Sequence, residues 1–320
     1  MKIIFFGSSD FAVPVLEAVK DTEETFLVVT QPDRKKGRFL KVHSTPVKEA
    51  AKKLGIKTFH PENVNSRDSM EYLKKFNADI FVVVSFGQIL CGELLDIPKI
   101  LPLNVHASLL PKYRGAAPIN WAIANGEKET GVAIIKMNEK MDEGDIVSEG
   151  AVSIAGDEDA IMLSERLSKK GAELLLNSID LIKRKEARFR SQDNNRASYA
   201  PKLKKQDGLI DWRWEAHEIY NRIRAFVPWP GCFTHWNKKI LKIWKAMPDS
   251  GPGTKDVKPG TVLEASKDSI LVGAGKSAIR ILELQVEGKR RMNVGDFIAG
   301  HREMKSGVNL TNQSLTKVSS

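Results

Sequence analysis

The first 180 residues alternate between short apolar runs and amphipathic segments. Residues 10–20, between the first two runs, place apolar side chains at helical spacing behind a possible N-cap at Ser9 or Asp10. Four apolar runs have the length and the β-branched or aromatic content of strands, namely residues 2–6, 25–30, 80–85 and 101–106. Strands that alternate with helices predict an α/β domain with a mostly parallel sheet and helices on both faces.

Two further strands are predicted at residues 131–137 and 146–154, close enough in sequence to pair as a hairpin around an acidic turn. Residues 159–183 have the pattern of a long amphipathic helix. The next segment, residues 183–207, is polar and basic without clear periodicity, which is typical of a linker.

The pattern changes after the linker. Residues 214–226 are predicted to form a helix, and residues 239–287 alternate β-rich runs with Gly, Lys and Asp turns. Short strands in such a series predict a small antiparallel barrel or sandwich. We therefore expect a first domain at residues 1–188, a linker at 189–207, a second domain at 208–305 and a disordered tail at 306–320.

The composition agrees with a globular chain, because 42% of the 320 residues are hydrophobic and 28% are charged. Apolar runs such as residues 80–84 are far shorter than the ~20 residues of a membrane helix. No leader pattern precedes the first strand, and two cysteines are too few for a disulfide framework. We expect a cytoplasmic protein without a membrane segment. The six histidines show no zinc spacing, so we expect no metal.

Charge is divided unevenly along the chain. Residues 1–180 carry 23 Lys and Arg against 26 Asp and Glu, whereas residues 181–320 carry 27 against 14. The net charge is therefore −3 in the first part and +13 in the second. A polyanionic partner for the second part explains this asymmetry, and a basic protein without such a partner is the alternative.

Asn104 and His106 end the fourth predicted strand. Side chains two apart on a strand share a face, so this amide and this imidazole project together. Ligands of open α/β sheets bind beyond the carboxyl ends of the strands. The pair suits stabilisation of an oxyanion, with His106 also able to exchange a proton. The alternative is a hydrogen-bonded histidine at a strand end with no chemical role.

The acidic turn at residues 141–145 (MDEGD) contributes Asp142, a carboxylate that could orient His106. An acidic turn in solvent is the alternative. A second turn, Gly7-Ser8-Ser9-Asp10, lies where a dinucleotide fold places its phosphate loop. It lacks the later glycines of that motif, so an ordinary strand-to-helix turn is favoured.

A long basic segment follows the second predicted strand at residues 31–48. Its length exceeds that of an ordinary βα loop, and its cations, together with one Phe, suit a nucleic-acid backbone. A solvated loop without a partner is the alternative. The cations that we single out for nucleic-acid binding are Arg34, Lys35, Lys36, Arg38 and Lys41.

The segment NVHASLLPKYRGAAP, which starts at Asn104, resembles the folate-site signature of the 10-formyltetrahydrofolate-dependent formyltransferases. The branch of that family that acts on methionyl-tRNA is the most similar. Further matching segments are IIFFGSSDFAVPVLEAV, QPDRKKGR, VVVSFGQIL, MDEGDI, YAPKL, GLIDW and RAFVPWPGCFT. The likeness covers nearly the whole chain apart from about the last 15 residues.

The resemblance implies a Rossmann-like formyltransferase domain, a linker and a C-terminal OB-like barrel. It implies transfer of the formyl group of 10-formyltetrahydrofolate to the α-amine of initiator methionyl-tRNA, with Asn104, His106 and Asp142 as the catalytic group. Initiator tRNA would be held by the basic segment, through Arg38 above all, and by the basic C-terminal domain. A monomer is expected. The residues that it assigns to the folate pocket are Phe86, Gln88, Ile89, Leu90, Ser108, Leu109, Leu110 and Pro111.

The alternative hypotheses for the function differ in the formyl acceptor or in the activity itself. A formyltransferase of the same chemistry could act on a small amine such as glycinamide ribonucleotide or an amino-sugar nucleotide, or release formate by hydrolysis. An RNA-binding module without activity would require a disrupted Asn-His-Asp set, and all three residues are present. The sequence departs from many relatives at Phe86, where they have Tyr, and at Cys91, where they have Pro. Phe86 cannot make a phenolic hydrogen bond.

Overall fold

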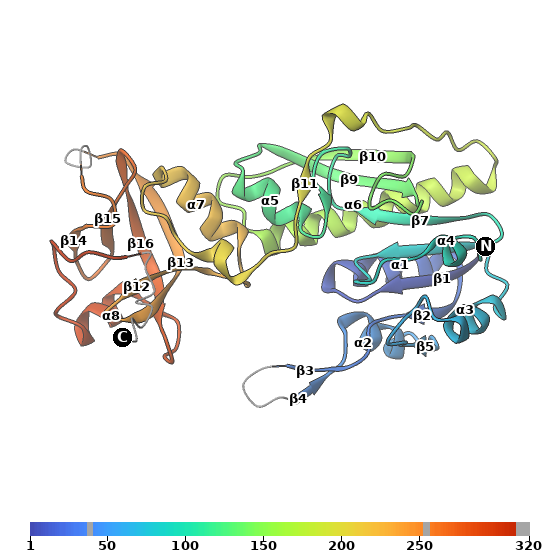
Figure 1. Cartoon of the computed structure of the whole chain (residues 1–320), viewed down its shortest axis with the longest axis horizontal. Coiled ribbons are helices and arrows are strands. Elements are labelled where there is room, and N and C mark those ends of the chain that lie inside the picture. The colour runs from blue at the N-terminus through green and yellow to red at the C-terminus, as the bar shows by residue number, and fades with distance from the viewer. Residues whose placement is uncertain (37–40, 252–256, 312–320) are drawn as a thin grey trace, which may run out of the picture. The chain divides into compact units, whose positions relative to one another are not determined.

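The computed structural model describes residues 1–36, 41–251 and 257–311, and for residues 35–42 no side chains (Figure 1). It divides into two compact units. Unit 1 comprises residues 1–118, 129–153 and 163–200, and unit 2 comprises residues 119–128, 154–162 and the chain from 201 onward. Arg38, one of the residues assigned to tRNA binding, lies outside the described residues.

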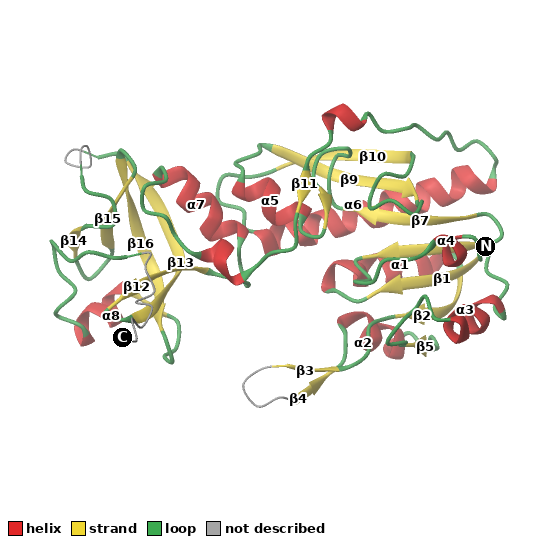
Figure 2. Cartoon of the chain, viewed as in Figure 1, coloured by secondary structure: helices red, strands yellow, loops and turns green. Residues whose placement is uncertain are grey.

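Unit 1 is built on a seven-stranded sheet of order β10-β9-β7-β6-β1-β2-β5 (Figure 2). The strands from β5 to β7 are parallel, whereas β9 runs antiparallel to both β7 and β10. Both the mostly parallel sheet and the hairpin around the acidic turn are therefore confirmed. The seven strands are β1 (Lys2–Gly7), β2 (Glu24–Val29), β5 (Thr58–Phe59), β6 (Ile80–Val84), β7 (Leu101–His106), β9 (Glu129–Lys136) and β10 (Ile146–Ser153).

Helices cover both faces of this sheet, which is why strands such as β6 are buried along their whole length. On one face, alternate residues of β1, β2 and β6 pack in a single core with Leu73, Leu94 and Leu95. On the other, Gly171 of the long helix α6 lies so close to Val105 that a Cβ there would come within 2.8 Å of its methyl group. The helices begin and end as α1 (Val13–Thr22), α2 (Pro46–Lys53), α3 (Arg67–Lys74), α4 (Gly92–Leu95) and α6 (Ala160–Lys183).

Local capping explains where several helices begin. Thr45 precedes α2 and accepts a hydrogen bond from the Lys48 N–H at 3.1 Å, with Pro46 at the first helical position. Ser66 caps α3 in the same way, at 3.3 Å from the Ser69 N–H.

Unit 2 contains a six-stranded antiparallel sheet of order β12-β13-β16-β15-β14, with β17 paired to β16. The predicted antiparallel arrangement of the C-terminal strands is confirmed. Its strands are β12 (Cys232–Trp236), β13 (Lys239–Asp249), β14 (Val262–Ala265), β15 (Ile270–Ala274), β16 (Ser277–Val286) and β17 (Met292–Asn293). Its helices include α7 (Ala216–Ala225) and α8 (Val294–Gly300), and α5 (Pro118–Ala124) lies almost wholly in it.

Part of the segment predicted as a linker is an integral part of unit 1. Arg190 exchanges two backbone hydrogen bonds with Ile146 at the start of β10, at 2.8 and 2.9 Å. A short strand, β11 (Tyr199–Ala200), pairs with β8 (Arg114–Gly115). Polar side chains and backbone groups make these contacts, so the segment has no apolar periodicity from which they could be predicted.

The predicted disorder from residue 306 is wrong for residues 307–311. Gly307 and Leu310 donate backbone hydrogen bonds to Val262 and Gly260, and Thr311 pairs with His235. The reason is that backbone hydrogen bonds and the buried side chain of Leu310 attach this segment to the sheet, and one apolar residue makes no periodic pattern. Residues 312–320 lie outside the described residues. None of the helices within the described ranges combines the length and apolar character of a membrane span.

Candidate active site

Asn104 and His106 lie at the carboxyl end of β7, between β6 and β9 in the sheet. Strand alternation directs both side chains to one face, while Val105 points to the face that α6 covers. His106 is only 5% exposed. This edge of the sheet carries the carboxyl ends of the parallel strands, the usual position of a ligand site in an open α/β sheet.

The structure brings Asp142 to this pair across 36 residues of sequence. One carboxylate oxygen, Oδ1, lies 3.3 Å from Asn104 Nδ2 and 3.6 Å from His106 Nδ1. The other, Oδ2, accepts the backbone N–H of Gly115 at 2.8 Å. The Asp142 side chain is 14% exposed. The acidic turn is therefore directed inward instead of lying free in solvent.

Both nitrogens of His106 face oxygen acceptors. Nε2 lies 3.0 Å from the carbonyl oxygen of Tyr113, and Nδ1 faces the Asp142 carboxylate. The two contacts fix the orientation of the ring between a main-chain carbonyl and a carboxylate.

The turn between β9 and β10 holds Asp142 in a left-handed backbone conformation, with φ of +54°. Close packing directs the turn inward: a Cβ on Gly144 would lie 1.8 Å from the carbonyl oxygen of Lys136. Glycine is thus required at position 144 by contact with the neighbouring strand.

Arg114 and Gln192 hold this turn in place, and no sequence pattern predicts either role. Arg114 is 1% exposed and pairs with Glu143 at 3.2 Å. Its Nη2 also donates to Gln192 Oε1 at 2.8 Å. Gln192 in turn donates from Nε2 to the carbonyl oxygens of Asp142 and Gly144 at 2.8 and 2.7 Å. A buried arginine and a glutamine within a polar stretch have no periodicity that marks them in advance.

The predicted folate segment at residues 85–90 follows β6 directly. Phe86 and Leu90 are buried in the core, and the Phe86 ring packs edge-on against Phe6 at 5.5 Å. Gln88 bonds to Val64 N–H and to the Pro61 carbonyl oxygen, at 2.9 and 3.2 Å. The Ile89 side chain, by contrast, is 67% exposed.

The second predicted folate segment starts immediately after β7. Ser108 is fully buried and donates to the Lys112 carbonyl oxygen at 2.6 Å. Leu110 packs in a small core with Ala133, Ile135 and Ile146, and Leu109 lies against Gly131. The backbone of the loop after β7 is thus held in place by the side chains of Ser108, Leu109 and Leu110. Pro111 is the next residue of this loop.

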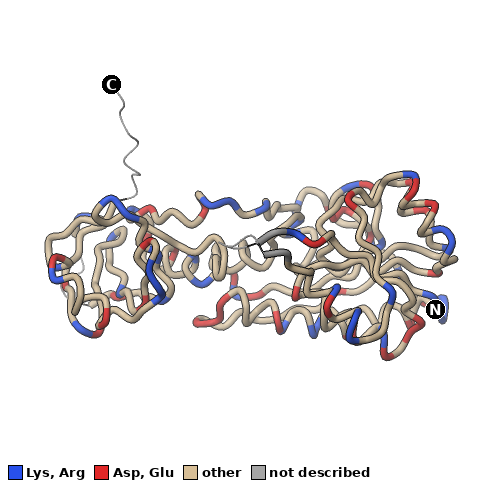
Figure 3. Tube along the Cα trace, turned by 90° about the horizontal axis from the view of Figure 1, so that it is seen from below, with Lys and Arg blue, Asp and Glu red and all other residues tan. Residues whose placement is uncertain are grey.

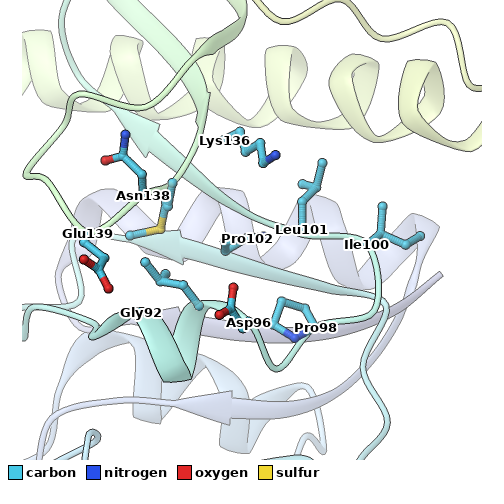
Figure 4. Close-up of a pocket in the computed structure, with 11 residues that line it drawn as sticks. Gly92, Asp96, Pro98, Ile100, Leu101, Pro102, Lys136, Asn138 and Glu139 are labelled. Carbon is cyan, nitrogen blue, oxygen red and sulfur yellow. The ribbon is translucent and has the colours of Figure 1, made fainter.

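A pocket of about 380 Å³ lies at the amino end of β7, where Leu101 and Pro102 line it (Figure 4). Other lining residues are Gly92, Leu95 and Asp96 and, before the Asp142 turn, Lys136, Met137, Asn138 and Glu139. None of the residues assigned to the folate pocket from the sequence lines it.

The other sequence-selected segments are structurally ordinary turns and hairpins. Ser8, in the turn after β1, donates to the Phe86 carbonyl oxygen at 2.9 Å, as part of a strand-to-helix turn. The basic segment forms a hairpin of β3 (Arg34–Lys36) and β4 (Lys41–His43). Arg34 is exposed and pairs with Glu62 at 3.2 Å, and the side chains of Lys35, Lys36 and Lys41 lie outside the description.

An amide, an imidazole and a carboxylate meet at the carboxyl edge of an open α/β sheet, an arrangement compatible with an enzyme that transfers a carbonyl-containing group. The residues suit an oxyanion donor, a proton carrier and its partner. Within the described ranges, His, Cys, Asp and Glu form no group of three or more that could hold a metal ion.

Comparison with known proteins narrows the class. Residues 1–179 match the formyl transferase model, and residues 202–302 match the model of the formyl transferase C-terminal domain. The chain therefore belongs to the formyl transferase family.

The chain is 44% identical over 309 residues to the methionyl-tRNA formyltransferase of Citrifermentans bemidjiense, covering 96% of each chain. It is also 44% identical to the enzyme of that name from Geobacter metallireducens, covering 97% of this chain and 98% of that one. Among solved structures, an N-formyltransferase from Helicobacter canadensis, in complex with folinic acid and dTDP-3-aminofucose, aligns with a TM-score of 0.66. It is 21% identical, and the alignment covers 88% of this chain and 98% of that one, so it supports the fold alone.

Proposed function

We propose that this chain transfers the formyl group of 10-formyltetrahydrofolate to the α-amine of initiator methionyl-tRNA. The observation that carries the proposal is the convergence of Asn104, His106 and Asp142 at the end of β7. The near-full-length relatives at 44% identity support methionyl-tRNA as the acceptor.

In the proposed reaction, the amine lone pair attacks the formyl carbon and a C–N bond forms, while the carbonyl electrons move to oxygen. Asn104 donates to that oxygen through the N–H that is not directed at Asp142. His106 donates to it as well, exchanging its contact with the Tyr113 carbonyl for the new oxyanion.

Collapse of the tetrahedral intermediate breaks the bond between the formyl carbon and the folate nitrogen. The attacking amine loses one proton, and the departing nitrogen gains one. Asp142 orients His106 and accepts or relays the amine proton. The proton then passes from Asp142 to the leaving nitrogen. The proton that the amine loses is thus the one that the leaving nitrogen gains.

The donor is proposed to bind along the two backbone segments that border the site. In residues 85–90 and Ser108–Pro111, the side chains of Phe86, Gln88, Leu90, Ser108 and Leu110 are buried or hydrogen-bonded and hold the main chain in place. Phe86 belongs to the core, so the absence of a phenolic hydroxyl there alters packing rather than a folate contact.

The acceptor is proposed to bind through its phosphates. The hairpin that carries Arg34, Lys35, Lys36, Arg38 and Lys41 and the net +13 of residues 181–320 supply cations for this polyanion. Lys and Arg recur along the backbone of the C-terminal unit (Figure 3). We further propose a monomer in the cytoplasm, where aminoacyl-tRNA is used.

The test is transfer of labelled formyl from 10-formyltetrahydrofolate to methionyl-tRNA, with glycinamide ribonucleotide as a parallel acceptor and His106→Ala as the control variant. Transfer to the tRNA alone, lost in the variant, is the expected result. Transfer to the small amine, or formate release without either acceptor, would overturn the assignment of the acceptor.

A further inference from the structure

The side-chain amide of Gln192 has a hydrogen bond for each of its four bonding positions. Oε1 accepts from Arg114 Nε at 3.1 Å and from Arg114 Nη2 at 2.8 Å. Nε2 donates to the carbonyl oxygens of Asp142 and Gly144. A reversed amide would place N–H groups against the guanidinium and an oxygen against two carbonyls, so only one orientation satisfies the set.

Arg114 fixes that orientation because it is itself immobilised. The guanidinium is buried and reaches three oxygen partners: Gln192 Oε1, Asn194 Oδ1 at 2.8 Å and Glu143 Oε1 at 3.2 Å. A buried guanidinium is stable only when such acceptors surround it. Two of them come from the segment after α6, and the third is the neighbour of Asp142 in the turn.

The turn needs this restraint. Asp142 has a left-handed backbone conformation, with φ of +54°, which L-residues adopt less readily than glycine, so contacts around the turn must hold it. The backbone carbonyls on either side of Glu143, those of Asp142 and Gly144, are the two that Gln192 binds. The direction of the Asp142 carboxylate therefore depends on an amide 50 residues away in sequence.

We propose that Gln192, locked by Arg114, is a positioning residue for formyl transfer. It holds the turn so that the Asp142 carboxylate meets His106 and Asn104. This inference rests on the proposed function and adds a residue from the segment that the sequence identified only as a linker.

The first experiment compares Gln192→Met with the wild-type chain in formyl transfer to methionyl-tRNA. Met is close to Gln in size and removes all four hydrogen bonds. Misplacement of a reacting group by about 1 Å can cost ~10²-fold, so we expect kcat to fall by roughly 10- to 100-fold. The KM values for donor and tRNA should stay within about threefold, because Gln192 touches neither predicted binding segment. The matched control is Gln206→Met, at an exposed glutamine, with kcat within about twofold of wild type.

A second variant, Gln192→Glu, separates the two halves of the amide. It keeps oxygen acceptors for Arg114 and loses both N–H donors to the turn. We expect a fall in kcat similar to that of the Met variant. This variant also keeps the test open if Gln192→Met does not fold, because the pairing with the buried guanidinium survives.

The decisive comparison is made in an Asp142→Ala background, by single-turnover kinetics. A residue that acts only through Asp142 has no further effect once the carboxylate is gone, so Gln192→Met should change the residual rate by less than about twofold. The same fold-loss in both backgrounds would show a general structural role and overturn the inference. So would wild-type kcat in both Gln192 variants. A wild-type chain that does not formylate methionyl-tRNA would instead overturn the proposed function, and this inference with it.

Discussion

At the scale of single residues, the site depends on backbone groups as much as on side chains. The Gly115 N–H and the Tyr113 carbonyl oxygen contact Asp142 and His106 directly. Both residues have positive φ, +116° and +60°. A Cβ at position 115 would also lie 2.8 Å from the Ala200 carbonyl oxygen, so glycine is needed there.

Asn104→Ala tests the oxyanion donor. Removing one such donor typically costs ~10²–10³ in turnover, and we expect kcat to fall within that range. The measurement is kcat at saturating donor and methionyl-tRNA. Asn195→Ala, at an exposed residue, is the control and should match wild type. A kcat for Asn104→Ala within about threefold of wild type would contradict the assignment.

Gly144→Ala tests the packing of the acidic turn. The added methyl group meets the Lys136 carbonyl oxygen at 1.8 Å, so the turn must move. We expect a loss of about 2 kcal/mol or more in the free energy of unfolding, measured by urea denaturation. Gly156→Ala is the control, because no atom lies within 4 Å of its added methyl group. Equal stability of the two variants would contradict the tight approach.

At the scale of elements, the basic hairpin β3–β4 and the paired strands β13–β16 have separable roles. The hairpin carries cations, and the strand pair carries the ion pair Asp249–Arg280 beside its backbone ladder. The hairpin is therefore tested by tRNA binding, and the strand pair by the free energy of unfolding.

Replacing Arg34, Lys35, Lys36 and Arg38 by Ala tests the hairpin. Cations that contact phosphates contribute to affinity and to its salt dependence, so the KM for tRNA should rise by roughly tenfold or more. The KM for the folate donor should not change. Lys52→Ala with Lys53→Ala, at the exposed end of α2, is the control. An unchanged KM for tRNA would favour a solvated hairpin without a partner.

The pair Asp249–Arg280 makes stability depend on pH. The backbone N–H of Gly251 and the Arg280 guanidinium both bind the Asp249 carboxylate and lower its pKa below the ordinary 3.8. A folded-state pKa below the unfolded one stabilises the protein above pH 4, and this contribution is lost as pH falls through the folded pKa.

Asp249→Asn should therefore lower the free energy of unfolding at pH 7 by about 1 kcal/mol. The difference from wild type should shrink as the pH is lowered below 4. Urea midpoints measured at pH 7, 5, 4 and 3 give the comparison, with Asp268→Asn, at an exposed turn residue, as the control. A difference that is constant over this pH range would exclude the pair as its source.

At the scale of the whole molecule, net charge is divided unevenly along the chain. The net charge is −3 over residues 1–180 and +13 over residues 181–320. A polyanion bound by many cations releases counterions, whereas a small folate does so far less.

The KM for methionyl-tRNA should therefore rise steeply with salt, by about tenfold or more between 50 and 200 mM. The KM for 10-formyltetrahydrofolate should rise much less over the same range. Initial rates at fixed saturating co-substrate give both slopes. Equal slopes for the two substrates would contradict phosphate contacts as the main source of tRNA affinity.

Most of the helices and strands, and part of the site, follow from local sequence pattern. Strands such as Leu101–His106 are visible as short apolar runs because both faces of the sheet are buried. The long helix at 160–183 is visible because burial of one face imposes a period of 3.6 on the chain. The shared face of Asn104 and His106 follows from the local geometry of a strand.

Which distant residues meet depends on the fold and not on local pattern. In the folded chain Asp142 lies beside His106, and Gln192 is hydrogen-bonded to the Asp142 turn. Residues 307–311 are attached to the C-terminal sheet. The fold also buries Phe86 and other residues that the resemblance assigned to the folate pocket. Hydrogen bonds between polar groups far apart in sequence leave no periodic trace, so their partners are set by the fold and not by the local pattern.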